Sequence, residues 1–163
     1  MKNKKYMIYD IYLIKKINQK LIKNGKKKLA YRIFIKSLNF IKTKKKKNPL
    51  IILKKAIKNT TSSIKIQTRR IRKSTYFIPI EISKDRAISQ AIRWIITSAK
   101  KKSSRNTFYQ NLANEFINAS KKTGNAFYRK QETKKIAAAN TRKNRRKNKN
   151  NKKSRKNKNN KKT

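Results

Sequence analysis

The sequence has no cysteine and no histidine among its 163 residues. This excludes disulfide bonds, zinc knuckles and catalysis by a thiolate or an imidazole. Gly25 and Gly124 are the only glycines, so no glycine-rich phosphate-binding loop can form. The five carboxylates are dispersed and form no acid–base or nucleophile pattern: Asp10, Glu81, Asp85, Glu115 and Glu132. We therefore predict that the chain is not an enzyme and holds no cofactor and no metal.

Long apolar runs are also missing. The longest stretch without a charged residue is nine residues, 106–114, whereas a membrane-spanning helix needs roughly 20. Binding to an anionic membrane surface is a weaker alternative, because the charge surrounds every predicted helix instead of one face. The basic N-terminal segment is interrupted by Asp10 and lysines, so we expect no cleavable targeting segment and no membrane partner.

Basic residues are what the sequence has in excess. It contains 51 Lys and Arg against 5 Asp and Glu, a net charge of +46. The last 23 residues hold 13 of the basic residues and no acidic one, so the first 140 still carry 38 basic and 5 acidic residues. Because such self-repulsion opposes a compact state unless a polyanion neutralises it, we predict a nucleic-acid partner.

Apolar periodicity predicts a mainly α fold, a bundle of about six helices. The expected helices cover residues 6–23, 26–42, 48–61, 83–102, 107–121 and 129–140. Leu29 belongs to the predicted core-facing stripe of the second helix. Asn24-Gly25 and Gly124 are expected to end the first and fifth helices, and Asn48-Pro49 to begin the third. Residues 1–140 are predicted to form the RNA-binding domain, and 141–163 a disordered, low-complexity basic tail without apolar residues.

One β-hairpin, the ribbon at residues 64–82, is predicted to project between the third and fourth helices. Alternating β-branched residues at 64–67 and 78–82 indicate two strands around a basic tip. If Ile64 and Ile66 share a face with Ile78 and Ile80, the hairpin must have a connection of odd length, such as residues 72–74, or a bulge. That register puts Arg70 on the Ile64 face, over Tyr76. An edge hairpin whose cations only maintain solubility is the alternative.

Candidate RNA-binding residues are spread over most of these elements. Cations on many sides suit a folded RNA, which is recognised by shape, better than a single recognition helix. Arginine adds bidentate phosphate contacts and stacking. The candidates are Lys2, Lys4, Lys5, Lys26, Lys27, Lys28, Lys65, Arg69, Arg70, Arg72, Lys73, Tyr76, Arg86, Arg93, Lys101, Lys102, Arg105, Arg129, Lys130, Lys134, Arg142, Arg145 and Arg146, and runs at 44–47 and 100–105 add further lysines.

The segment TRRIRKSTYFIPIEI, residues 68–82, resembles the signature of the bacterial and organellar S-seven family of small-subunit ribosomal proteins. In that family an Arg-Arg turn precedes Ser-Thr-Tyr and a Val-Pro-Val/Ile-Glu strand. Further blocks resemble the family in order and spacing, at residues 24–27, 91–95, 112–115, 122–126 and 137–140. The sequence departs from the family at the ribbon tip, where the family's Gly-Gly is Arg72-Lys73, and at the C terminus, where a basic tail replaces a histidine-containing segment. It also departs at residues 129–134 and in its short N-terminal arm.

The resemblance implies a helical bundle with a ribbon and a structural role in the small ribosomal subunit. It implies binding to the 3′ major (head) domain of small-subunit rRNA, nucleation of head assembly, and a ribbon near the exit-site tRNA and the mRNA exit path. Neighbouring head and platform proteins are implied as partners, with tRNA and mRNA bound transiently and no homo-oligomer. A histone-like architectural DNA-binding protein is the rival hypothesis. Heavy use of Lys, Asn and Ile indicates an AT-rich gene and an organellar ribosome, with a mitochondrial location favoured and a plastid as the alternative.

Overall fold

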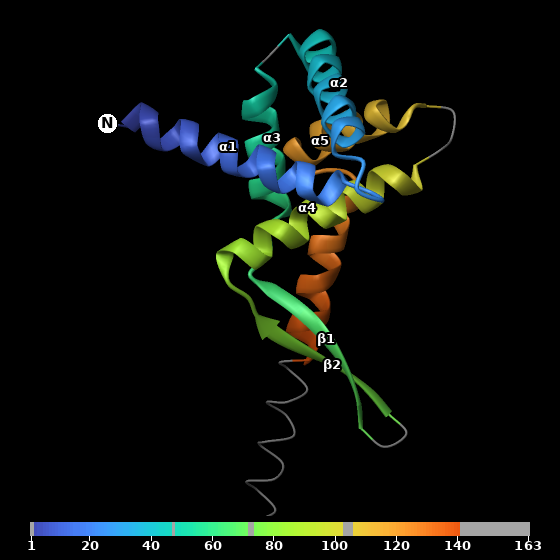
Figure 1. Ribbon diagram of the computed structural model, residues 1–163. Helices are drawn as coiled ribbons and strands as arrows, with labels where there is room; N and C mark the ends of the chain where they lie inside the picture. Colours follow the sequence, from blue (N-terminus) through green and yellow to red (C-terminus); the bar gives the residue numbers. More distant parts are fainter. Residues whose placement is uncertain (1, 47, 72–73, 103–105, 141–163) are drawn as a thin grey trace, which may run out of the picture. The chain divides into compact units, whose positions relative to one another are not determined.

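The computed structural model describes residues 2–46, 48–71, 74–102 and 106–140, and only the backbone of 2–8, 71 and 74. In this part of the chain, six helices and one two-stranded antiparallel sheet follow one another (Figure 1). They are α1 (Lys2–Leu21), α2 (Lys27–Lys45), α3 (Pro49–Thr60), β1 (Ile64–Ile71), β2 (Ser74–Glu81), α4 (Lys84–Lys101), α5 (Phe108–Ser120) and a last helix at residues 125–140. The predicted fold class, a mainly helical chain with a hairpin between the third and fourth helices, is confirmed. The predicted tail lies outside the described residues.

The chain divides into two compact units. The first, the helical unit, comprises Met1–Ser63 and Ser83–Lys130, and the second, the ribbon unit, comprises Ile64–Ile82 and Gln131–Thr163. Each is described below by itself.

Helix α5 is the centre of the helical unit, in contact with α2, α3 and α4 (Figure 1). Its Leu112 and Phe116 are fully buried, together with Phe34 of α2, Leu53 of α3 and Ile95 of α4. Burial of one such side chain contributes roughly 1.5–3 kcal/mol. Apolar burial around α5 therefore opposes the charge repulsion of the surface.

Two of the predicted helix boundaries are confirmed in detail. After α1, Asn24 and Gly25 have φ values of 51° and 71°, the left-handed conformation expected of a helix stop. At the start of α3, the Asn48 side chain accepts a hydrogen bond of 3.0 Å from the Leu50 amide, and Pro49 occupies the first helical position.

The boundary between α5 and the last helix differs from the prediction. Helix α5 ends at Ser120, and Lys122, not Gly124, provides the first left-handed residue, with φ 62°. The next helix starts at residue 125, four residues earlier than predicted. There the buried Glu115 carboxylate accepts a 3.0 Å hydrogen bond from the Ala126 amide. A side chain of α5 thus satisfies an amide of the following helix's first turn, which no local sequence pattern predicts.

Two other acidic residues connect α1 to neighbouring helices. Asp10 pairs with Lys54 of α3, with 2.6 Å between Oδ1 and Nζ. Asp85, in the first turn of α4, accepts a 2.7 Å hydrogen bond from the Tyr12 hydroxyl and lies 3.8 Å from the Lys16 ammonium. Both carboxylates are thus engaged with groups of their own chain, Asp10 largely buried and Asp85 with a side chain that is 76% exposed, so they neutralise little of the surface charge.

The predicted hairpin register is wrong. Ile66 pairs with Pro79 and Ile71 with Ser74, so two residues connect the strands instead of three. Ile64 and Ile66 therefore lie on the face opposite Ile78 and Ile80, because side chains alternate along a strand. The prediction assumed that one apolar face fixes the register, yet on both strands these isoleucines are only partly buried or exposed. The turn itself, residues 72–73, lies outside the described residues.

In the ribbon unit, the end of the last helix is bonded to the second strand. The Asn140 side-chain amide donates a 2.7 Å hydrogen bond to the Phe77 carbonyl. Ala137 of the same helical segment is buried. The ribbon is therefore held by a helical segment that is distant in sequence.

We predict that Gly124→Ala destabilises the protein by about 2–4 kcal/mol, since left-handed strain and overpacking add. Gly124 has φ +93°, and a Cβ there would lie 3.0 Å from Asn118 Cβ and 3.1 Å from Glu115 Oε1. Gly25→Ala is the matched control, because its φ is +71° but no atom lies within 4 Å. It should cost only about 1 kcal/mol. Urea unfolding followed by circular dichroism measures both, and equal losses would contradict the packing role.

Candidate nucleic-acid interface

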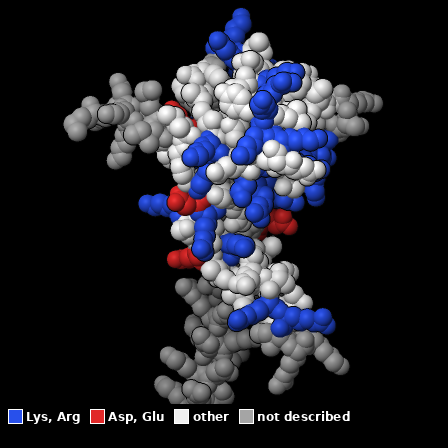
Figure 2. Space-filling model, in the orientation of Figure 1, with Lys and Arg blue, Asp and Glu red and all other residues white. Residues whose placement is uncertain are grey.

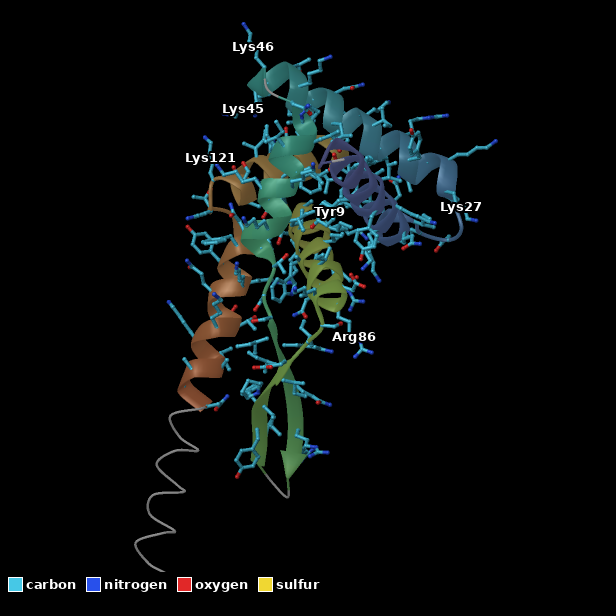
Figure 3. The ribbon with its side chains drawn as sticks, turned by 90° about the vertical axis from the view of Figure 1, so that its left-hand side faces the viewer. Tyr9, Lys27, Lys45, Lys46, Arg86 and Lys121 are labelled. Atoms are coloured by element: carbon cyan, nitrogen blue, oxygen red, sulfur yellow. The ribbon has the colours of Figure 1, made fainter. Side chains whose placement is uncertain are left out.

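Exposed cations cover the helical unit without forming a single stripe. On the face shown in Figure 2, lysine and arginine side chains are scattered over the helices with few acidic groups between them. Figure 3 shows three cations extending outward from the helices: Lys27 at the start of α2, Lys46 just after the end of α2, and Arg86 in the first turn of α4. This distribution agrees with the predicted multi-sided surface and differs from that of a single recognition helix.

The structure places the predicted RNA-binding residues in three groups. Exposed side chains are those of Lys26, Lys27, Lys28, Lys65, Arg69, Arg70, Tyr76, Arg86, Arg93, Lys101, Lys102 and Lys134. Partly buried ones are Arg129 and Lys130. Outside the residues with described side chains are Lys2, Lys4, Lys5, Arg72, Lys73, Arg105, Arg142, Arg145 and Arg146.

On the ribbon, the observed register brings an arginine and an aromatic ring together. Arg69 pairs directly with Tyr76, which is 43% exposed, and Lys65 lies on the same face. Arg70 instead pairs with Thr75 on the opposite face, so the expected packing of Arg70 over Tyr76 is also wrong. A guanidinium for phosphate beside a ring for base stacking is a combination suited to RNA.

Lys130 has a contact inside the helical unit. Its ammonium donates a hydrogen bond to the Asn59 carbonyl at the end of α3. The Asn59 side chain in turn donates to the carbonyls of Ala119 and Ser120, both at 3.0 Å. Lys130 therefore helps to join the ends of α3 and α5 to the last helix.

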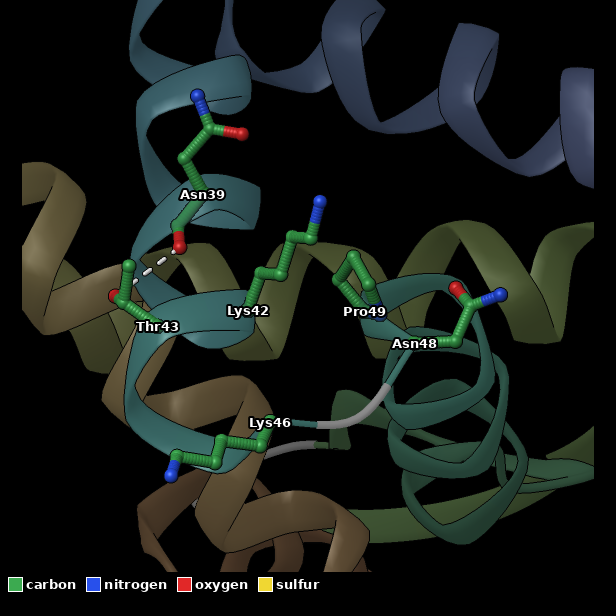
Figure 4. Close-up of a pocket in the computed structure, with 6 residues that line it drawn as sticks. All are labelled: Asn39, Lys42, Thr43, Lys46, Asn48 and Pro49. Atoms are coloured by element: carbon green, nitrogen blue, oxygen red, sulfur yellow. Dashed lines mark hydrogen bonds between the residues drawn. The ribbon is translucent and has the colours of Figure 1, made fainter.

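A broad hollow of about 980 Å³ lies where α2 ends and α3 begins. It is lined by Asn39, Lys42, Thr43, Lys46, Asn48 and Pro49 (Figure 4). The Thr43 hydroxyl is turned back to the Asn39 carbonyl at 3.2 Å, whereas Lys46 points away from Pro49. The lining contains amides and ammonium groups but no carboxylate, so this hollow extends the basic surface.

A second hollow, here called the lysine-rimmed cavity, measures about 320 Å³. Its lining joins apolar side chains to three lysines: Leu21, Lys23, Lys26, Leu29, Ala30, Ile33, Lys100 and Phe108. The predicted basic runs at 26–28 and 100–105 thus meet around one cavity, although they are more than 70 residues apart.

Several cations of these hollows were absent from the candidate residues named individually. Lys23 lies just after α1, and Lys42 and Lys46 are four residues apart near the end of α2. A spacing of four indicates one helix face and could have identified the latter pair. Lys23 has no comparable signal, since its proximity to Lys100 depends on packing.

Within residues 2–46, 48–71, 74–102 and 106–140, no three acidic side chains come together in a way that could hold a metal ion. None of the helices described there is both long and apolar enough to cross a membrane.

The comparison with protein families gives a match over most of the chain. The sequence model of the family described as Ribosomal protein S7p/S5e matches residues 1–141. The match includes the helical unit and residues 64–82 and 131–141 of the ribbon unit, and it ends where the basic tail begins.

We predict that Lys65→Gln combined with Arg69→Gln weakens binding to a folded RNA. The slope of log K against log salt should fall by roughly 0.7–0.9 for each phosphate that no longer has a cation beside it. Thermal stability should stay the same or rise slightly, because like charges are removed. Lys36→Gln with Lys58→Gln removes equal charge from exposed helical positions and serves as the control. An unchanged affinity and slope in the ribbon variant would favour the hairpin with purely solubilising cations.

Proposed function

We propose, from the premise that the chain belongs to the Ribosomal protein S7p/S5e family and is a small-subunit ribosomal protein, that it organises the 3′ major (head) domain of small-subunit rRNA. It does so as a structural component without chemistry of its own, and it helps to nucleate assembly of the head. The observation that supports this role is the uncompensated positive charge carried on separate elements.

The few carboxylates of the chain are mostly engaged internally. Of the five, Asp10, Asp85 and Glu115 contact groups of their own chain. The 38 basic residues of the first 140 therefore have few internal anions available. Phosphates of a folded RNA approach a protein from several sides, so cations on α2, α4 and the ribbon can be neutralised at once. A protein that contacts several RNA segments holds them together, which is what nucleation of assembly requires.

For the ribbon we propose contacts near the exit-site tRNA and the mRNA exit path. Arg69 beside the exposed Tyr76 supports this, because a cation and an aromatic ring together hold a single-stranded nucleotide by its phosphate and base. Crosslinks from a photoreactive residue at position 76 in translating ribosomes test the idea. Crosslinks confined to rRNA helices of the head would oppose it.

We also propose that neighbouring head and platform proteins contact this chain, and that the ribosome is organellar and mitochondrial. The support for the location is residue usage, since abundant Lys, Asn and Ile indicate an AT-rich gene. Gradient sedimentation of purified mitochondria and plastids distinguishes the two organelles. Recovery of the protein with the plastid small subunit would overturn the mitochondrial assignment.

The rRNA assignment is tested by equilibrium binding of the full chain to three competitors of equal length. These are a 3′ major domain transcript, another rRNA domain and duplex DNA. We predict that the 3′ major domain binds tighter by about 100-fold or more at physiological salt, because matched shape adds to non-specific charge neutralisation. Equal affinity for all three is the result expected of a histone-like architectural protein and would reject the proposal.

A further inference from the structure

The exposure of Leu29 contradicts the apolar pattern of its helix. The spacing in α2 predicted Leu29 in the core, yet its side chain is 48% exposed. The neighbouring stripe residues Ala30 and Phe34 are buried as predicted. Leu29 instead lines the lysine-rimmed cavity, so an apolar side chain of the predicted core faces a space large enough for another group.

The apolar walls of this cavity come from three helices of the helical unit. Leu21 ends α1, Leu29 and Ile33 lie in the first turns of α2, and Phe108 begins α5. A volume of about 320 Å³ is at the lower end of the roughly 300–1,000 Å³ typical of small-ligand sites. The cavity can therefore receive one compact apolar or flat group.

The rim determines the charge of the occupant. Lys23 and Lys26 flank the left-handed turn after α1, and Lys100 lies in the last turn of α4. The lining contains no carboxylate. Three ammonium groups around an apolar space repel one another, so the occupant that fits is an anion with an apolar or aromatic part.

We propose that the lysine-rimmed cavity binds one unpaired nucleotide of the rRNA, an inference that rests on the proposed function. The base enters between Leu29, Ile33 and Phe108, while phosphates on either side lie at Lys23, Lys26 and Lys100. An unpaired nucleotide is flat and apolar on its face and anionic on its backbone, which matches both parts of the lining. Proteins recognise RNA in this way at loops and bulges, where bases can leave the stack.

The cavity also explains why two basic runs distant in sequence meet. Lys26 and Lys100 are in different parts of the chain, and both line the same cavity with its apolar walls. A nucleotide bound there would fix the local path of the RNA backbone over the end of α1, the start of α2 and the end of α4. The surface then has one site that selects an RNA conformation, in addition to cations that attract any phosphate.

The test compares variants of the full chain in binding to the 3′ major domain transcript. Leu29→Ser should lower affinity about tenfold, the order expected when one base is no longer stacked, while the salt slope stays unchanged. Lys23→Gln with Lys100→Gln should lower the slope by roughly 0.7–0.9 for each phosphate left without its lysine. Ile51→Ser is the matched control, because Ile51 is 63% exposed on α3 and does not line the cavity. It should change neither quantity.

A photoreactive benzoylphenylalanine in place of Leu29, incorporated into assembled small subunits, identifies the occupant directly. A crosslink to an unpaired rRNA nucleotide supports the inference, and a crosslink to a neighbouring protein overturns it. Wild-type affinity in both Leu29→Ser and the lysine double variant also overturns it. In either case tight binding of the unaltered chain to the transcript leaves the rRNA assignment standing, whereas failure of the unaltered chain to bind specifically rejects that assignment itself.

Discussion

The fold of this protein has to overcome repulsion among like charges. With 38 basic and 5 acidic residues in the first 140, neutralisation within the chain is impossible. Three of the acids contact other helices or backbone amides: Asp10 contacts α3, Asp85 contacts α1, and Glu115 the last helix. They stabilise helix arrangement locally and leave the outer surface positive, so compactness must come from apolar burial and from an external polyanion.

Burial around α5 supplies the internal part of that stability. Helices α2, α3 and α4 all contact it, and its side chains are apolar or neutral wherever they are buried, with Glu115 as the exception. That exception occurs where the backbone needs an acceptor, at the first turn of the next helix. The cations therefore lie outside this core, on several helices. The lysine-rimmed cavity forms where α1 and α4 end and α2 and α5 begin, because packing is incomplete there.

The features that could be predicted from the sequence depend on interactions between residues that are close in the chain. Helix stops at Asn24-Gly25 and the Asn48 cap depend on one or two residues, and both are confirmed. Interactions between distant residues account for the differences. The early start of the last helix depends on Glu115, and the position of Leu29 depends on where α1 and α4 end and α5 begins. The ribbon register was predicted wrongly, because the prediction assumed one shared apolar face, whereas the isoleucines of the two strands lie on opposite faces. The basic character of the interface was predictable, whereas the meeting of Lys23, Lys26 and Lys100 was not.

We infer that uncompensated charge destabilises the free protein and that binding to rRNA relieves the repulsion. The most direct measurement is the thermal unfolding midpoint of the unbound chain as a function of NaCl concentration, followed by circular dichroism. Screening shortens the range of repulsion, from about 30 Å at 0.01 M to about 3 Å at 1 M salt, so the account predicts a midpoint that rises steadily with salt. Addition of the 3′ major domain transcript at low salt should raise it further. A midpoint that stays constant or falls as salt increases would contradict the account, because internal ion pairs would then outweigh the repulsion.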